Sequence, residues 1–243
     1  LRAVELAQKE DLVEFFKLYL YTFQYPGAHI KSQEVVKQID NGIHFKPAQY
    51  ILKLLRYASE KTGGNVGINK FEVCHCIFND LRVTRDNEGV EKTWDRISQN
   101  RKDRVEYDQT GDVVRYASDI IDYMEIANLL KTYDSRTYYL NTLEEDAIIK
   151  FCESTEWFAG YDVMIKNRSG EIGAVNEQKD RWFAYVNRDT KDTDFSTDIL
   201  AFIANDAEEL EELKKNASYI QNTETVELIE RDEHLNKRIA IDY

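Results

Sequence analysis

The segment from Thr110 to Asn141 constrains the fold of this chain more than any other part of the sequence. Its first half, TGDVVRYASDIIDYMEIANLL, places apolar residues at the spacing of one helical face. Its second half, KTYDSRTYYLN, has a polar turn at residues 134–136 between two strand-like runs, 129–133 and 137–140, and predicts a hairpin. A winged helix presents its recognition helix and wing in this order, so we expect a winged-helix element here.

The scarcity of helix-breaking residues extends this expectation to the rest of the chain. Only 2 prolines and 10 glycines interrupt the 243 residues, which favours long helices joined by short links over a sandwich or barrel with many turns. We therefore expect a mainly α protein, a helical bundle with winged-helix elements. Residues 157–193 show no clear period and are consistent with short strands or an ordered loop. Helices are predicted over residues 11–23, 47–61, 69–78, 85–104, 110–127, 142–151 and 198–216.

Formal charge is distributed unevenly along the chain. The net charge of −13 opposes nucleic-acid binding, because a duplex repels an acidic surface and is held by Lys and Arg. The side chains of residues 1–81 sum to +1, however, those of 82–140 to −2 and those of 141–243 to −12. A DNA-facing surface before residue 141 is therefore compatible with the charge. We predict a helical winged-helix recognition domain over 1–155 and an acidic C-terminal region or linker over 156–243.

The cysteines and the hydropathy pattern indicate a cytoplasmic protein. Cys74, Cys76 and Cys152 form an odd set without regular spacing, which favours reduced thiols. No secretory signal or bilayer-spanning apolar stretch is seen, so no membrane partner is expected. Cys74, His75 and Cys76 carry zinc-ligand side chains, but a structural zinc site needs four ligands, so packing is the favoured interpretation. The chain begins at Leu1 without a methionine, and we expect it to be a segment of a longer protein.

Four segments, taken in order, resemble the DNA-recognition part of AlwI-type type IIS restriction endonucleases and their nicking relatives. They are FFKLYLYTFQYP, FKPAQYILKLLRYA, GINKFEVCHCIFND and GDVVRYASDIIDYMEIANLLKTYDSRTYYLN, and they lie within roughly the first 155 residues. The resemblance is strongest at Gln24-Tyr25-Pro26, in the apolar helix after Pro47, and in the closing helix with its hairpin. The sequence departs from the family pattern between Arg104 and Thr110, where it is short.

The resemblance implies a modular enzyme of a restriction–modification system. Helical, winged-helix subdomains would read a short asymmetric site in double-stranded DNA, and a separate C-terminal nuclease domain would hydrolyse the DNA with Mg2+ held by a carboxylate cluster. No convincing catalytic cluster is seen in the 243 residues. We therefore expect this chain to recognise DNA while a domain outside it performs the cleavage, and we expect no cofactor in this segment.

The candidate DNA-binding residues surround the predicted recognition helix. Arg and Gln can pair with base edges through two hydrogen bonds, and cations of a wing can neutralise phosphate charge. The alternative is a solvated face whose cations pair with local acids, as Asp112 and Asp119 could do with Arg115. We predict groove contacts by Gln109, Thr110 and Arg115, wing contacts by Lys131 and Arg136, and phosphate contacts by Arg101, Lys102 and Arg104.

Two further function classes remain open from the sequence. Asp162, Glu177 and Lys179 have the order of a Mg2+-dependent nuclease site, which would make the chain a complete small nuclease. Such sites need the second acid and the lysine on a buried apolar strand, whereas GAVNEQKDR is polar around them, so an ordinary acidic surface is favoured. Alternatively, the winged-helix element serves protein assembly, with the acidic last third as the contact surface.

Overall fold

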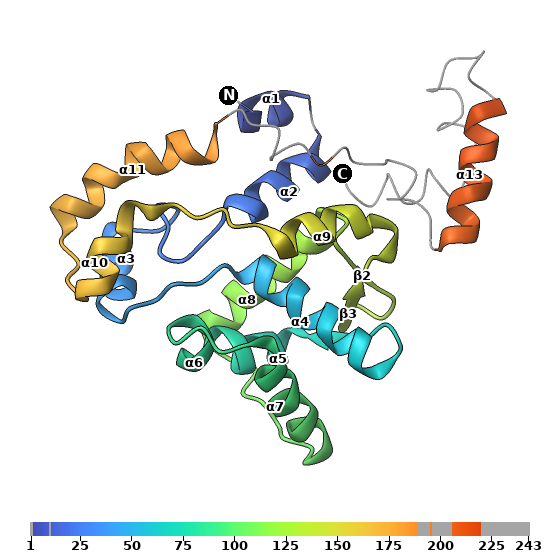
Figure 1. Cartoon of the computed structure of the whole chain (residues 1–243), viewed down its shortest axis with the longest axis horizontal. Coiled ribbons are helices and arrows are strands. Elements are labelled where there is room, and N and C mark those ends of the chain that lie inside the picture. Colours follow the sequence, from blue (N-terminus) through green and yellow to red (C-terminus); the bar gives the residue numbers. More distant parts are fainter. Residues whose placement is uncertain (1, 10, 189–194, 196–205, 220–243) are drawn as a thin grey trace. The chain divides into compact units, whose positions relative to one another are not determined.

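A computed structural model of the chain describes residues 2–9, 11–188, 195 and 206–219. The chain divides into two compact units, Leu1–Asn141 with Glu145–Phe195, and Thr142–Glu144 with Ser196–Tyr243. Helices dominate the described residues (Figure 1), so the predicted mainly α class is confirmed. The elements of the first unit are α1 (Arg2–Gln8), α2 (Leu12–Thr22), α3 (Ser32–Asp40), α4 (Pro47–Thr62), β1 (Ile68–Asn69), α5 (Lys70–Val73), the π-helix η1 (Cys74–Phe78), α6 (Leu81–Thr84), α7 (Val90–Lys102), α8 (Asp112–Ile126), β2 (Leu130–Thr132), β3 (Thr137–Leu140), α9 (Glu145–Glu153), the 3₁₀ turn η3 (Ala159–Tyr161), α10 (Asp162–Asn167) and α11 (Ile172–Val186). The described elements of the second unit are the 3₁₀ turn η2 (Thr142–Glu144) and α13 (Ala207–Tyr219).

Helix α4 is the central element of the larger core. It begins at Pro47, where a missing backbone N–H is tolerated, and it ends at Gly63, whose φ of 73° suits a residue without a side chain. Ile51, Leu54 and Leu55 are fully buried. Their helix packs against α7 and α9, as Figure 1 shows. Burial of this apolar face, more than helix propensity, holds α4 in place.

Helix α8 leads into the predicted hairpin, which is confirmed. Ala117, Ile121 and Met124 bury one face of α8 against the larger core. β2 and β3 then pair in antiparallel fashion, with Leu130 opposite Leu140. A third strand, β1, pairs with the other edge of β3, so that the strand order is β1-β3-β2. This strand was not predicted, because two residues carry no detectable period.

Helices α3, α10 and α11 enclose a second, smaller apolar core. It contains Val35 and Ile39 of α3, Tyr161 of η3, and Val175 and Trp182 of α11. The sequence suggested short strands or an ordered loop for residues 157–193, and over 162–167 and 172–186 that suggestion is wrong. Helix α11 buries only two side chains, so the helical period is hidden in the sequence.

The last predicted helix is seen in part. The structure gives α13 at Ala207–Tyr219, and residues 198–205 of the prediction lie outside the described residues. Leu210 and Leu213 face Leu143 in a small cluster within the second unit. None of the described helices is long and apolar enough to cross a membrane.

Candidate nucleic-acid interface

The start of α8 exposes a polar face. Gly111 precedes the helix with a φ of 107°, a conformation that residues with side chains rarely adopt. Arg115 and Tyr116 are exposed, and the guanidinium of Arg115 lies 5.3 Å from the centroid of the Tyr116 ring. Within the described part of the chain, Arg115 forms no ion pair with Asp112 or Asp119. Its charge is therefore available to an external partner.

The segment before α8 carries Gln109 and Thr110, and both side chains are exposed. Thr110 donates two hydrogen bonds to one carboxylate oxygen of Asp108, from its backbone N (2.9 Å) and from its hydroxyl (2.7 Å). These bonds hold the pKa of the Asp108 carboxyl below its usual range. Among the described contacts, the side chain of Gln109 makes no hydrogen bond, so its amide can both donate and accept.

The turn of the hairpin is built around Asp134. Its carboxylate accepts the backbone N–H groups of Arg136 at 2.9 Å and Thr137 at 2.8 Å, and Ser135 takes a φ of 57°. This Asx turn fixes the direction in which residues 133–136 leave the sheet. Arg136 is exposed and Tyr133 is 74 % exposed at this tip, while Lys131 of β2 is half-buried.

Arg101, at the end of α7, has a structural partner that the sequence did not reveal. Its Nε and Nη2 lie 2.6 and 2.7 Å from the two carboxylate oxygens of Glu72, whose side chain is 3 % exposed. Nη2 also donates to the carbonyl of Gly67 at 2.7 Å. The neighbouring Lys102 and Arg104 are exposed. Arg101 therefore ties α7 to the β1–α5 junction, whatever contact it makes with DNA.

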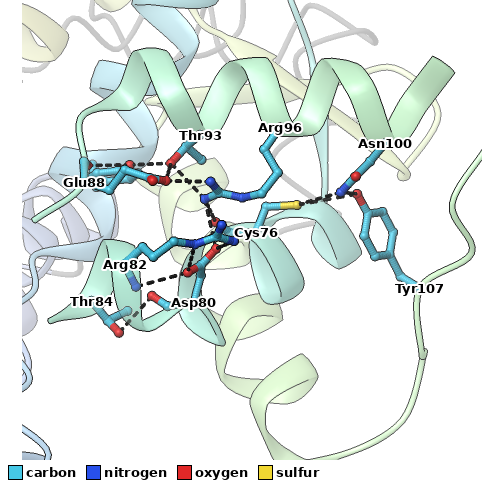
Figure 2. A network of polar contacts seen from close by, with 10 residues as sticks. Cys76, Asp80, Arg82, Thr84, Glu88, Thr93, Arg96, Asn100 and Tyr107 are labelled. Atoms are coloured by element: carbon cyan, nitrogen blue, oxygen red, sulfur yellow. Dashed lines mark hydrogen bonds and ion pairs between the residues drawn. The ribbon is translucent and has the colours of Figure 1, made fainter. Parts of the chain in front are cut away.

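A polar network fixes the rest of α7 against η1 and α6 (Figure 2). Arg96 bridges Glu88 at 2.6 Å and Asp80 at 2.9 Å, and it also donates to the carbonyl of Cys76. Burial opposes ionisation of Asp80, but hydrogen bonds from Arg82 and the charge of Arg96 outweigh it and lower its pKa. Helix α7, which carries Arg101 and Lys102, is thus tied to η1 and α6, and Arg104 lies two residues beyond its end.

Asparagine 69 begins α5 through a reciprocal capping box. Its side chain accepts the N–H of Phe71 and of Glu72, and the Glu72 carboxylate accepts the N–H of Asn69 at 3.0 Å. This reciprocal pair of contacts satisfies backbone N–H groups that the first turn of a helix leaves without partners. Glu72 consequently serves both the cap and Arg101, which explains why a carboxylate is buried at this point.

The predicted DNA-binding residues fall into three groups along the chain's fold. Gln109, Thr110 and Arg115 gather at the start of α8, whereas Lys131 and Arg136 lie in the hairpin that follows the other end of the same helix. The third group consists of Arg101 and Lys102 in the last turn of α7 and Arg104 two residues beyond it. Two hollows adjoin the first group: one of about 410 Å³ beside Gln109, and one of about 830 Å³ beside Tyr116.

The nuclease-like trio lies on helices. Asp162 begins α10 and accepts a 2.7 Å hydrogen bond from the indole of Trp157, while Glu177 and Lys179 lie on α11. No strand carries them, in contrast to the pattern such a site requires. Among the described residues, no three His, Cys, Asp or Glu side chains cluster in a way that could hold a metal ion. Cys74 and Cys76 are buried as free thiols.

Two side chains near the first group have contacts that the sequence did not reveal: His75, which was considered only as a zinc ligand, and Tyr107. His75 contacts the backbone of Asp108, and Tyr107 stacks on His75. No motif announces either residue, because their contacts join η1 to a segment 32 or more positions later in the chain.

Comparison with known proteins gives one family and one fold. The family model described as "Restriction endonuclease BpuJI - N terminal" matches residues 1–183. A solved structure, described as pyrene- and phenanthrene-modified DNA in complex with the BpuJ1 endonuclease binding domain, has a similar fold, with a TM-score of 0.60 and 19 % identity. The match covers 75 % of this chain and 66 % of that one, so the chain spans just under two thirds of its length. The comparison with curated proteins gave no match.

Proposed function

The chain belongs to the family of N-terminal domains of the restriction endonuclease BpuJI, and from this membership we propose that it recognises a short sequence in double-stranded DNA. Cleavage is assigned to a nuclease domain outside these 243 residues, which would use Mg2+. The observation that carries the proposal is the family match over residues 1–183. The DNA complex of the structurally similar binding domain supports it.

The element order supports a winged helix as the reading unit. Helix α4, strand β1, the α5–η1 helix, helix α8 and the β2–β3 hairpin follow one another, and β1 closes the sheet beside β3. Helices α6 and α7 are inserted between the α5–η1 helix and helix α8. In this arrangement α8 is the recognition helix and the hairpin is the wing, which contacts the backbone or the minor groove.

The distribution of charge distinguishes residues expected to contact bases from residues expected to contact phosphates. Asp112 occupies the first turn of α8, and its charge disfavours phosphate at the helix start. Gln109 and Arg115, which flank that turn, are therefore assigned to base edges, where Gln pairs with adenine and Arg with guanine. The exposed cations Lys102, Arg104 and Arg136, together with Lys131, are assigned to phosphates.

The parent enzyme is proposed to be a type IIS restriction endonuclease. Recognition and cleavage in such an enzyme lie in separate domains, and the family that this chain matches is that of an N-terminal domain. Residues 1–155 would then be the recognition domain, and 156–243 a region that leads toward the nuclease or a protein partner. We also propose that this parent enzyme is of the AlwI type.

Duplex binding tests the proposal directly. We expect the chain to raise the fluorescence anisotropy of a mixed-sequence duplex at low salt. The logarithm of the association constant should fall with the logarithm of salt concentration with a slope of about −3.6 to −4.5, because about four to five phosphate contacts release counterions. With Mg2+ the duplex should remain intact.

Two results would contradict this account. Absence of duplex binding at low salt would favour the alternative of a protein-interaction module. Cleavage of the duplex in Mg2+ that is abolished by Glu177→Ala would instead favour a complete nuclease that uses Asp162, Glu177 and Lys179. Glu171→Ala, which changes an exposed acid at the start of α11, is the matched control.

A further inference from the structure

We propose that His75 and Tyr107 are positioning residues for DNA recognition: they fix the segment 105–110 and thereby determine where Gln109 and Thr110 meet the base pairs. The inference rests on the proposed function and adds to it the residues on which specificity depends. Neither residue needs to touch DNA for this role.

The first link is a hydrogen bond from the π-helix to the segment. Nε2 of His75 lies 2.7 Å from the backbone carbonyl oxygen of Asp108. A carbonyl only accepts, so Nε2 must carry the proton and donate it. His75 is partly exposed, while Cys74 and Cys76 on either side are buried. Single turns of π-helix occur often at functional sites, and here the turn directs one imidazole toward the segment.

The second link is the ring of Tyr107. It stacks on the His75 imidazole with a centroid separation of 5.2 Å and an interplanar angle of 12°. Its hydroxyl accepts a 3.0 Å hydrogen bond from Asn100 of α7 and lies 3.5 Å from the sulfur of Cys76 (Figure 2). Burial raises the pKa of Tyr107 to about 12, so the hydroxyl stays protonated. Tyr107 is thus held from both α7 and η1.

The third link passes this restraint to the reading residues. Asp108 accepts from His75 through its carbonyl and from Thr110 through its carboxylate, at 2.9 Å from the backbone N and 2.7 Å from the hydroxyl. Gln109 lies between these two anchored residues with its side chain exposed. A reading residue held in its binding geometry loses less conformational freedom on binding, and so binds its correct base pair more tightly.

The arrangement separates specificity from general affinity. Lys102, Arg104 and Arg136 do not take part in the His75–Tyr107 contacts. When His75 or Tyr107 is replaced, the non-specific attraction of these cations to phosphates should therefore remain. Only the additional affinity for the correct sequence should fall. Loss of one hydrogen bond that positions the segment corresponds to a decrease of about five- to tenfold.

The experiment begins with the wild-type chain and a pool of randomised duplexes, from which the preferred sequence is selected. The ratio of its affinity to that of a scrambled duplex is then measured for His75→Leu and His75→Gln. We expect His75→Leu to lower this ratio about five- to tenfold, with scrambled-duplex affinity unchanged within about twofold. His75→Gln, whose amide can donate to the Asp108 carbonyl, should restore most of the ratio.

Further variants keep the test decisive if His75→Leu fails to fold. Tyr107→Phe keeps the ring stack and removes the hydroxyl contacts, so it should lower the ratio about two- to fivefold. Tyr57→Phe, on α4, is the matched control and should leave the ratio unchanged. Amide hydrogen exchange at Thr110 should quicken in His75→Leu and in Tyr107→Phe, without DNA present.

Each result has a separate meaning. A wild-type chain that binds no duplex contradicts the proposed function, and the hydrogen exchange at Thr110 still tests the positioning contacts. If the wild type selects a sequence but His75→Leu and Tyr107→Phe keep its full affinity ratio, the inference is wrong. Equal losses for selected and scrambled duplexes would also overturn it, because they would indicate general damage to the fold.

Discussion

Replacing Arg101 by leucine is expected to lower the free energy of unfolding by about 3 kcal/mol. The change removes both hydrogen bonds to the Glu72 carboxylate and leaves that charge buried at 3 % exposure without its counter-ion. The Arg101 side chain is itself 39 % exposed, but Glu72 is buried, so the loss exceeds that of an ion pair exposed on both sides, which contributes at most about 1 kcal/mol. Urea unfolding followed by circular dichroism measures it.

Two matched variants isolate the cause. Lys102→Leu, at the next and exposed position, should change the unfolding free energy by no more than about 0.5 kcal/mol. In the double variant Glu72→Gln, Arg101→Leu, no charge remains buried, and the amide oxygen can still accept from the N–H of Asn69. It should therefore recover much of the lost stability. Equal stability of Arg101→Leu and the wild type would show that the ion pair contributes nothing.

Replacing Arg115 and Arg136 together by alanine is expected to weaken duplex binding about 30- to 300-fold. Arg115 is assigned to a base edge, where a bidentate contact contributes about 1–3 kcal/mol. Arg136 is assigned to a phosphate, and its loss should reduce the magnitude of the salt slope by about 1. Neither change should affect folding, because the side chains of Arg115 and Arg136 are both exposed.

The single variants and a distant lysine complete this test. Arg115→Ala should weaken binding most for the preferred sequence, whereas Arg136→Ala should weaken binding to all sequences alike. Lys53→Ala, an exposed cation on α4 outside the assigned surface, should leave affinity within about twofold. Equal weakening by Lys53→Ala and by Arg115→Ala would mean that general charge, and not the assigned surface, attracts the duplex.

The strongly periodic parts of the fold could be predicted from the sequence. The apolar stripe of residues 110–127, the turn at 134–136 and the proline at 47 each reflect a local preference that the tertiary structure preserves. The family match over residues 1–183 confirms the predicted relation to a restriction endonuclease, and DNA recognition by this chain remains a proposal. The narrower assignments to AlwI-type and type IIS enzymes remain predictions.

Short or weakly amphipathic elements could not be predicted. Strand β1 has two residues, and it exists because β3 offers a free edge 68 or more positions later. Helix α11 buries only Val175 and Trp182, since its partners α3 and η3 form a small core. Both elements depend on long-range contacts that no local pattern encodes.

In the candidate site, too, the sequence predicted local features but not long-range contacts. Arg115, Gln109 and Arg136 are exposed, as a reading surface requires, but their contact with DNA remains a prediction. Arg101 looked like a phosphate ligand because it lies in a basic stretch, and its buried partner Glu72 is 29 positions earlier in the chain. A double variant that removes both charges would allow the phosphate role of Arg101 to be tested apart from its structural role.

Hydrogen exchange with and without the duplex tests most directly that α8 and the hairpin bind DNA. The wild-type chain is mixed with its preferred duplex at low salt, and amide exchange is followed by mass spectrometry. We predict slower exchange in peptides that cover 107–116 and 131–137, and unchanged exchange over α13, residues 207–219. Tight binding with unchanged exchange over 107–116 and 131–137, and protection elsewhere, would contradict the proposed interface.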